Sequence, residues 1–226
     1  MGVVERRYTD PCGIARALDR VGERWALLVA RELVLGPKRF GDLVRGLDGI
    51  SANVLTHRLK QLEAAGVVRH RVLGPPANTP VYELTAWGQE LEPVLLSLAG
   101  WGSRAPLPTS KPTSMSTDAF AISLLTTYLP PTRPHTEITV NLALGIDRYA
   151  LTVGGTTMTI ERGHHDRADL DLTSDVDTAR AVIYALSDAE AAITTGHLAY
   201  RGSKVHLRLF LRCFERPLVH PDATNR

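Results

Sequence analysis

Hydrogen-bonding and cationic side chains gather on one side of a helical segment in the stretch 38–66. Ser51 can cap this segment, because its hydroxyl accepts from an unpaired amide of the first turn. Apolar residues at three-to-four spacing predict a buried stripe: Ile50, Val54, Leu55, Leu59 and Leu62. The opposite face then carries groups that hydrogen-bond to base edges or phosphates: Asn53, Thr56, His57 and Lys60, with Ser51 at its start, Arg58 at its margin and Arg39 at its edge.

The elements around this segment favour a DNA-reading helix over an ordinary surface helix. The stretch 38–66 reads as two short amphipathic helices joined by a tight glycine-containing turn. Two β-branched runs follow, Val67–Leu73 and Val81–Leu84, separated by a proline-rich loop that cannot be helical. A hairpin in this place predicts a wing, from which Arg69 and Arg71 can reach the DNA backbone. A helical hairpin that never touches nucleic acid is the alternative that this pattern alone leaves open.

The first ninety or so residues resemble a known family. The matching positions are Cys12, Gly22-Glu23-Arg24-Trp25, Leu27, Leu28, Arg31, Glu32, Gly36–Phe40, Leu43, Ile50-Ser51, Leu55, Arg58-Leu59, Leu62-Glu63, Gly66-Val67-Val68, Tyr82, Leu84-Thr85, Gly88 and Leu91. This pattern resembles the HxlR-type branch of the MarR-like winged-helix transcription regulators. The resemblance ends near Gly102 and implies a DNA-binding homodimer.

A tryptophan-rich segment after the wing is a candidate dimerisation helix. Thr85 can cap it, and Pro93 should bend it. Its apolar residues recur at helical spacing: Trp87, Leu91, Val94, Leu95, Leu98 and Trp101. An intramolecular core helix is the alternative. In a dimer, two reading helices about 34–36 Å apart select a roughly palindromic operator in double-stranded DNA.

Composition and chain organisation indicate a protein of two domains. The chain has 226 residues, 44% hydrophobic and 22% charged, with a net charge of +2. The stretch 103–116 is rich in Pro, Ser and Thr and reads as a linker between domains 1–102 and 117–226. No apolar run approaches the roughly 20 residues that span a bilayer, so we expect a cytoplasmic protein without a membrane partner.

The second half predicts an α+β domain. A helix is expected at Asp118–Leu129, ended by Pro130-Pro131, followed by a strand at Ile138–Leu144. A hairpin comes next, formed by Tyr149–Val153 and Thr156–Ile160 around a two-residue turn at Gly154-Gly155. The remaining elements are a strand at Ala168–Thr173, a helix at Asp175–Leu186, a shorter helix that stops at Gly196, a strand at His197–Arg201 and a helix capped by Ser203. This order of helix, antiparallel sheet, helices, strand and helix resembles the sterol-carrier-protein type of domain, as does the turn Tyr200–Ser203. The acidic residue of that turn is replaced here by Ser203-Lys204.

That resemblance implies an apolar hollow between the sheet and its helices that takes a hydrophobic small molecule. The candidate lining residues are Phe120, Leu124, Leu142, Leu144, Leu151, Ile160, Ile183, Phe210 and Phe214. The alternative is that these residues form a plain core. A ligand would regulate DNA binding only by favouring one arrangement of the dimer.

Cysteine and histidine give few further candidates. Cys12 either packs as a small apolar residue at the start of the first helix, beside an inward stripe of Ile14, Leu18 and Val21, or acts as a redox sensor assisted by Arg6 and Arg7. Cys213 lies in an apolar run and is expected to be buried and inert. His164-His165-Asp166 has metal-ligand chemistry, but adjacent residues seldom converge on one metal, so we expect an exposed turn and no metal site.

The sequence lacks the common catalytic motifs for nucleophilic, phosphate, dinucleotide and zinc chemistry, so we expect neither an enzyme nor a cofactor. The fold class predicted is α+β, a winged helix-turn-helix domain followed by a sterol-carrier-protein-like domain. Two functions follow from it. The first is a homodimeric transcriptional regulator of HxlR type whose second domain senses an apolar effector, with thiol oxidation at Cys12 as an alternative trigger. The second is a hydrophobic-ligand carrier that uses the winged helix for dimerisation.

Overall fold

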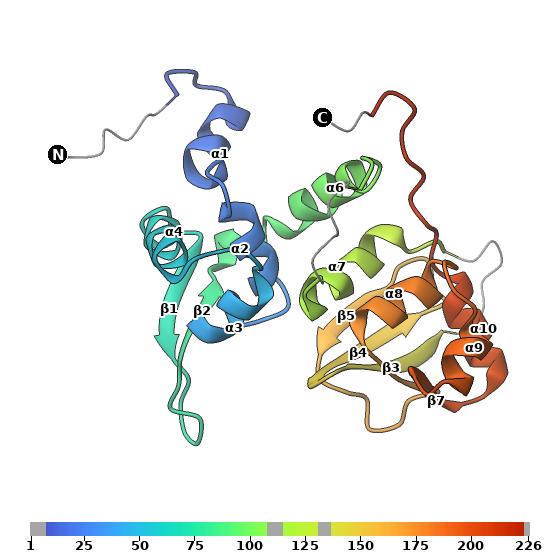
Figure 1. The fold of residues 1–226 in the computed structure, drawn as a ribbon. Coiled ribbons are helices and arrows are strands. Elements are labelled where there is room, and N and C mark those ends of the chain that lie inside the picture. Colours follow the sequence, from blue (N-terminus) through green and yellow to red (C-terminus); the bar gives the residue numbers. More distant parts are fainter. Residues whose placement is uncertain (1–7, 108–114, 131–136, 224–226) are drawn as a thin grey trace. The chain divides into compact units, whose positions relative to one another are not determined.

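The computed structural model describes residues 8–107, 115–130 and 137–223. The chain divides into two compact units, Met1–Leu95 and Leu96–Arg226 (Figure 1). Several predictions lie outside the described residues: the arginines Arg6 and Arg7 beside Cys12, the middle of the expected linker at 108–114, and Pro131. Within the described ranges, no helix combines the length and hydropathy needed to cross a membrane.

The first unit is a winged helix-turn-helix. Its elements are α1 (Gly13–Val21), α2 (Ala26–Leu33), α3 (Phe40–Gly46), α4 (Ala52–Ala64), β1 (Val68–Val72), β2 (Pro80–Leu84), α5 (Ala86–Gln89) and the start of α6 (Glu92–Gly102). Strands β1 and β2 pair antiparallel, from Val68 opposite Leu84 to Val72 opposite Pro80. The hairpin of helices and the wing expected from the stretch 38–84 are therefore both present.

The core of the first unit forms around α2 and α4. Fully buried apolar residues come from successive elements: Ala26, Val29, Ala30, Leu33, Leu43, Leu55, Leu59, Leu62, Val67 and Val68. Helix α1 contributes less than its pattern predicts, because Ile14 and Leu18 are exposed and only Val21 of the expected inward stripe is buried. The prediction for Ile14 and Leu18 was therefore wrong, since the residues that α1 buries are Ala15 and Val21.

The tryptophan-rich segment forms two helices where one bent helix was expected. Thr85 caps α5 as predicted, with its hydroxyl accepting from the Gly88 amide at 3.0 Å. Helix α5 ends at Gln89, and α6 begins at Glu92. Pro93 explains the interruption, because proline has no amide hydrogen for a helix interior and is tolerated in the first turn, where none is required.

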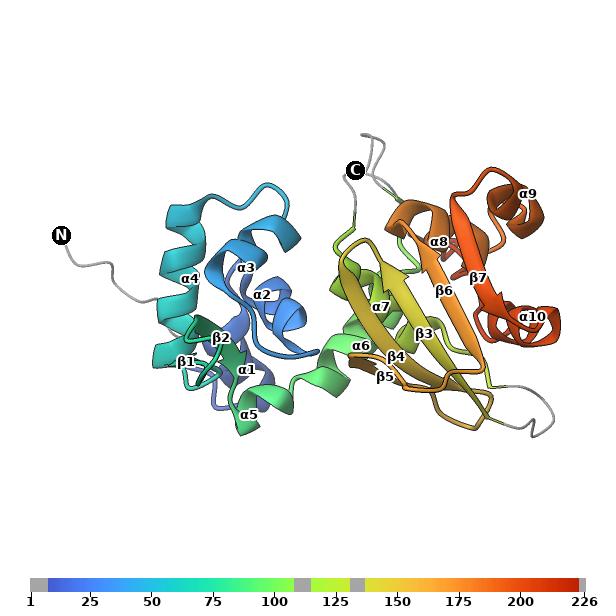
Figure 2. The ribbon, with the colours of Figure 1, turned by 90° about the horizontal axis from the view of Figure 1, so that it is seen from below.

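The second unit is an α+β domain with a five-stranded mixed sheet. Its elements are α7 (Thr117–Thr127), β3 (Ile138–Leu144), β4 (Asp147–Val153), β5 (Thr159–Arg162), β6 (Leu170–Ser174), α8 (Val176–Ile183), α9 (Ala189–Thr194), β7 (Leu198–Gly202) and α10 (Lys204–Arg212). The strand order is β5-β4-β3-β6-β7. In Figures 1 and 2, α7, α8 and α10 lie on one face of this sheet.

The sheet differs from the antiparallel prediction at its centre, where β3 and β6 run parallel. After β5 the chain crosses the sheet before β6, and the side chain of Asn141 holds this crossing. Its amide nitrogen donates to the His165 carbonyl at 3.1 Å, and its oxygen accepts from the His165 amide at 2.7 Å. The crossing returns β6 beside β3 in the same direction. His165 is partly buried and belongs to the structural segment that joins β5 to β6. Among the described residues no metal-binding cluster occurs.

The turn between β4 and β5 is longer than the two residues predicted at Gly154-Gly155. Strand β4 ends at Val153, and β5 begins only at Thr159. The Tyr128 hydroxyl hydrogen-bonds to the backbone of this turn: it accepts from the Gly154 amide at 3.0 Å and donates to the Gly155 carbonyl at 2.7 Å. These groups are therefore satisfied by a side chain, and the prediction of a tight hairpin was wrong.

A buried ionic cluster anchors the start of α7 to the sheet. The Asp118 carboxylate is fully buried and accepts from Arg162 at 2.6 Å and from the Tyr149 hydroxyl at 2.5 Å. Arg162 also donates to Asp147 at 2.8 Å. Burial and the neighbouring Asp118 carboxylate raise the pKa of Tyr149, so this hydroxyl remains a donor. The cluster fixes the first helix of the second unit in place.

Candidate nucleic-acid interface

Helix α4 is defined at both ends by local sequence. The Ser51 hydroxyl accepts from the Val54 amide at 3.3 Å, which is the N-cap that the sequence predicted. At the other end Gly66 has a φ of +74°, a conformation that glycine adopts without strain. Leu55, Leu59 and Leu62 are buried in the core and hold the helix against the rest of the unit.

The outward face of α4 carries the polar residues predicted for it. Asn53, Thr56, His57 and Lys60 are all exposed. Residues three or four positions apart share one face of a helix, so these four side chains form a continuous surface. We call this surface, defined by Asn53, Thr56, His57 and Lys60, the reading face.

Arg58 does not belong to the reading face. Its side chain is buried, donates to the Gln61 side chain and lies 3.4 Å from the Glu23 carboxylate. The reason is its position: Arg58 lies three residues after Leu55 and four before Leu62, and therefore on the core side of the helix. Val54 shows the reverse, since it was predicted in the buried stripe and is 40% exposed. Arg58 is better described as a structural residue.

The wing carries Arg69 and Arg71, but their charge is shared with Glu83 on β2. Arg69 donates to this carboxylate at 2.6 Å and Arg71 at 2.7 Å. Burial acts to raise the pKa of Glu83, but the hydrogen bonds from Arg71 and Arg69 outweigh it and hold the pKa below its ordinary value. The side chains of Arg69 and Arg71 remain exposed, so the wing can approach phosphates while Glu83 orients them.

A buried ion pair positions the helices that precede the reading face. Glu32 of α2 is fully buried and accepts from Lys38 at 2.5 Å and from Arg31 at 2.8 Å. The Lys38 backbone pairs with Tyr82 of β2 in both directions. A side chain at Gly46 would place its Cβ 2.4 Å from the Glu32 carboxylate, so any larger residue would displace that carboxylate from its present position. Sequence reasoning missed this pair, although an acidic residue at a core position of an apolar helix was a visible signal.

Arg39 and Cys12 lie at the ends of helices. Arg39 precedes α3, where its backbone amide donates to Asp42 at 3.3 Å and its side chain is exposed. Cys12 is also exposed, and its sulfur accepts from the Ala15 amide at 3.3 Å as the N-cap of α1. Of the two alternatives for Cys12, its exposure contradicts the one in which it packs as a small apolar residue at the start of the helix. Cys213 is buried, and burial raises the pKa of its thiol.

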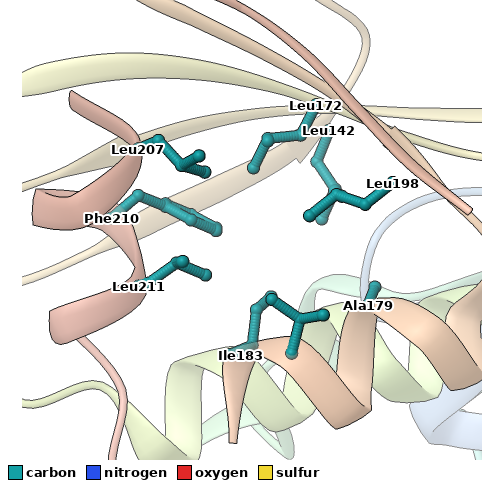
Figure 3. A pocket seen from close by; sticks show the side chains of 9 residues that line it. Leu142, Leu172, Ala179, Ile183, Leu198, Leu207, Phe210 and Leu211 are labelled. Carbon is teal, nitrogen blue, oxygen red and sulfur yellow. The ribbon is translucent and has the colours of Figure 1, made fainter. Parts of the chain in front are cut away.

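The residues predicted to bind an apolar ligand form a packed core in the second unit. All nine are buried. Three of them, Leu142, Ile183 and Phe210, line a cavity of about 10 Å³ that Leu172, Ala179, Val182, Leu198, Leu207 and Leu211 complete (Figure 3). The other six do not line it: Phe120, Leu124, Leu144, Leu151, Ile160 and Phe214. A volume of this size is at the limit for one water molecule, far below the roughly 300 Å³ or more of a ligand site.

Comparison with known proteins identifies the first unit. The model of the HxlR-like helix-turn-helix family matches residues 20–108. The HTH-type transcriptional regulator sll1512 of Synechocystis sp. is 39% identical over 92 residues, which cover 41% of this chain and 68% of that protein. The regulator YvaP of Bacillus subtilis is 36% identical over 91 residues, 39% of this chain and 82% of YvaP. The chain belongs to the HxlR-like helix-turn-helix family.

The solved structure of the redox regulator HypR in its reduced form has 32% sequence identity and a TM-score of 0.37, over 40% of this chain and 90% of that one. HxlR-like proteins are transcriptional regulators and not enzymes, as the sequence predicted. The family model ends at residue 108, so the sterol-carrier resemblance of the second unit stays a prediction.

The Glu83→Gln substitution tests the wing network of this HxlR-like unit. Because the folded state lowers the pKa of Glu83, its contribution to stability is present above the ordinary value of 4.5 and is lost as the pH falls through the lowered value. We expect the variant to be less stable at pH 7 by up to about 1 kcal/mol, and the difference to vanish in acid.

Urea unfolding followed by tryptophan fluorescence measures this difference in stability, since Trp25 and Trp87 lie in the same unit. Glu161→Gln, an exposed glutamate of β5, is the control. An equal difference at every pH would contradict the assignment.

Proposed function

We propose that the chain is a homodimeric transcriptional regulator that binds a roughly palindromic operator in double-stranded DNA through α4. The observation that carries this proposal is the reading face, which is exposed along a helix whose other side is fixed in the core. Family membership supports DNA binding, and the wing with Arg69 and Arg71 supports contacts to the backbone beside the groove. Ser51 is the N-cap of α4 and Arg39 the N-cap of α3, and we propose that both contact phosphate.

Exposed apolar residues support the dimer. On α6, Val94, Leu98 and Trp101 recur at four- and three-residue spacing and are exposed, with Trp101 at 75%. On α1, Ile14 is 75% exposed, and Leu18 is exposed as well. Large apolar side chains that recur along a helix and face water indicate an interaction surface. A second copy of the chain is the partner that a palindromic operator requires.

The carrier alternative has less support than the regulator. A carrier needs a hollow, whereas the apolar cavity of the second unit measures about 10 Å³. We therefore infer that the second unit is a packed domain without a ready-made ligand cavity. An apolar effector would bind there only if α8 and α10 separate from the sheet.

Lys60→Ala tests the reading face. Each lysine that neutralises a phosphate contributes about one to the slope of log affinity against log salt, so we expect the slope to fall by about one and affinity to weaken. The measurement is fluorescence anisotropy over a salt series, with a duplex selected from random DNA by the wild-type protein. Lys204→Ala, an exposed lysine of the second unit, is the control. An unchanged slope for Lys60→Ala would remove it from the interface.

Leu98→Asp tests the dimer surface on α6. A carboxylate at the centre of an apolar interface is desolvated without a partner, so we expect a shift from dimer to monomer. Sedimentation velocity at micromolar concentration measures it. The control is Ile146→Asp, because Ile146 is 88% exposed in the second unit and lies outside α6. If both variants sediment like the wild type as a dimer, the interface lies elsewhere.

We propose thiol oxidation at Cys12 as the trigger, and the exposure of its sulfur supports this. Cys12 is exposed and Cys213 is buried, so we expect a maleimide to label one thiol quickly in the native protein and the second only after unfolding. Mass spectrometry of the labelled peptides measures this. Peroxide should then change operator affinity of the wild type but not of Cys12→Ser. Slow labelling of Cys12, or an equal response of both proteins, would exclude this trigger.

A further inference from the structure

The hydroxyl of Thr56 is already used within α4. Its Oγ1 donates to the Ala52 carbonyl, four residues earlier, at 2.8 Å, while the residue as a whole is exposed. A threonine hydroxyl has one hydrogen, so this bond leaves no donor for a base edge. The group that Thr56 offers to a partner is therefore its methyl, with only the acceptor side of the hydroxyl beside it.

The neighbours of Thr56 complete a mixed surface. Ala52, Asn53 and Lys60 lie three or four positions away on the same helix and are exposed. Ala52 adds a second methyl on the same side of the reading face. Asn53 adds an amide of the kind that pairs with the N6 and N7 edge of adenine, and Lys60 adds a cation.

We propose that Thr56 reads thymine through methyl-to-methyl contact in the major groove. Thymine alone among the four bases carries a C5-methyl group there, and threonine methyl groups are suited to contact it. This inference rests on the proposed function, because it requires α4 to enter the groove. Thr56 would then prefer thymine over cytosine, because cytosine has no methyl group at that position. A contact through the hydroxyl would be less selective, because several bases offer it a hydrogen-bond partner.

The test removes the methyl group from each partner in turn. Thr56→Ser keeps the hydroxyl and removes the methyl, whereas Thr56→Val keeps the methyl and removes the hydroxyl. A duplex selected from random DNA with the wild-type protein is then resynthesised with uracil in place of each thymine, one at a time, which deletes only the C5-methyl. Affinity is measured by fluorescence anisotropy at one fixed salt concentration.

We expect a single uracil substitution at the contacted thymine of one half-site to weaken wild-type binding about fourfold, the contribution of one buried methyl group. Thr56→Val should bind like the wild type and show the same uracil response. Thr56→Ser removes the methyl group from both protomers, so it should be about fifteenfold weaker on the thymine duplex, roughly fourfold for each half-site, and insensitive to uracil at that position. Thr194→Ser is the matched control, since Thr194 is an exposed helical threonine of the second unit whose hydroxyl donates to the Glu190 carbonyl at 2.8 Å.

Two kinds of result overturn the proposal, and they are distinguishable. If a duplex is selected but the uracil series is flat, or if Thr56→Val weakens binding while Thr56→Ser does not, the methyl contact is wrong and DNA binding stands. If no duplex sequence is enriched, the proposed function fails and the inference fails with it.

Discussion

The arrangement of the first unit depends on the buried contact between Glu32 and Lys38. A carboxylate without access to water is tolerated only when cations satisfy it, and removing one partner of such a pair typically costs about 3–5 kcal/mol. The pair joins three elements, because Glu32 belongs to α2, Lys38 precedes α3, and the Lys38 backbone pairs with Tyr82 in the wing. Gly46 leaves room for the carboxylate at the end of α3. The helix hairpin and the wing are thus held in one geometry.

Charge is distributed unevenly over the predicted DNA surface. Arg58 lies in the core beside Glu23 and Gln61, and Arg69 and Arg71 share Glu83, so three of the arginines predicted to face DNA are already paired within the protein. Lys60 on the reading face and Arg39 at the start of α3 are both exposed. Paired arginines have less conformational freedom to lose when they meet a phosphate, whereas an unpaired lysine contributes more to salt dependence. The wing is therefore suited to a preoriented contact with the DNA backbone, and Lys60 of α4 to the salt-dependent part of the affinity.

Much of this structure was predictable because helix periodicity and capping are local. Ser51, Thr85 and Ser203 cap the helices expected of them, and the strands expected at Ile138–Leu144 and Ala168–Thr173 correspond to β3 and β6. The failures have non-local causes. The turn at Gly154-Gly155 is set by Tyr128, 26 residues earlier, and Asp118 is paired with Arg162, 44 residues later. Arg58 was misplaced because its position, three residues after Leu55 and four before Leu62, lies on the core side of the helix, where the aliphatic part of a long cationic side chain can be buried.

The two cysteines of the chain differ in access to solvent, and this has a consequence for stoichiometry. Cys12 faces water at the start of α1, and Cys213 is enclosed after α10. A native chain therefore has a single sulfur within reach of another thiol, and any protein disulfide that it forms without unfolding must join it to a second polypeptide. A disulfide formed by the native protein would therefore report contact between two polypeptides, because one folded chain alone cannot form it.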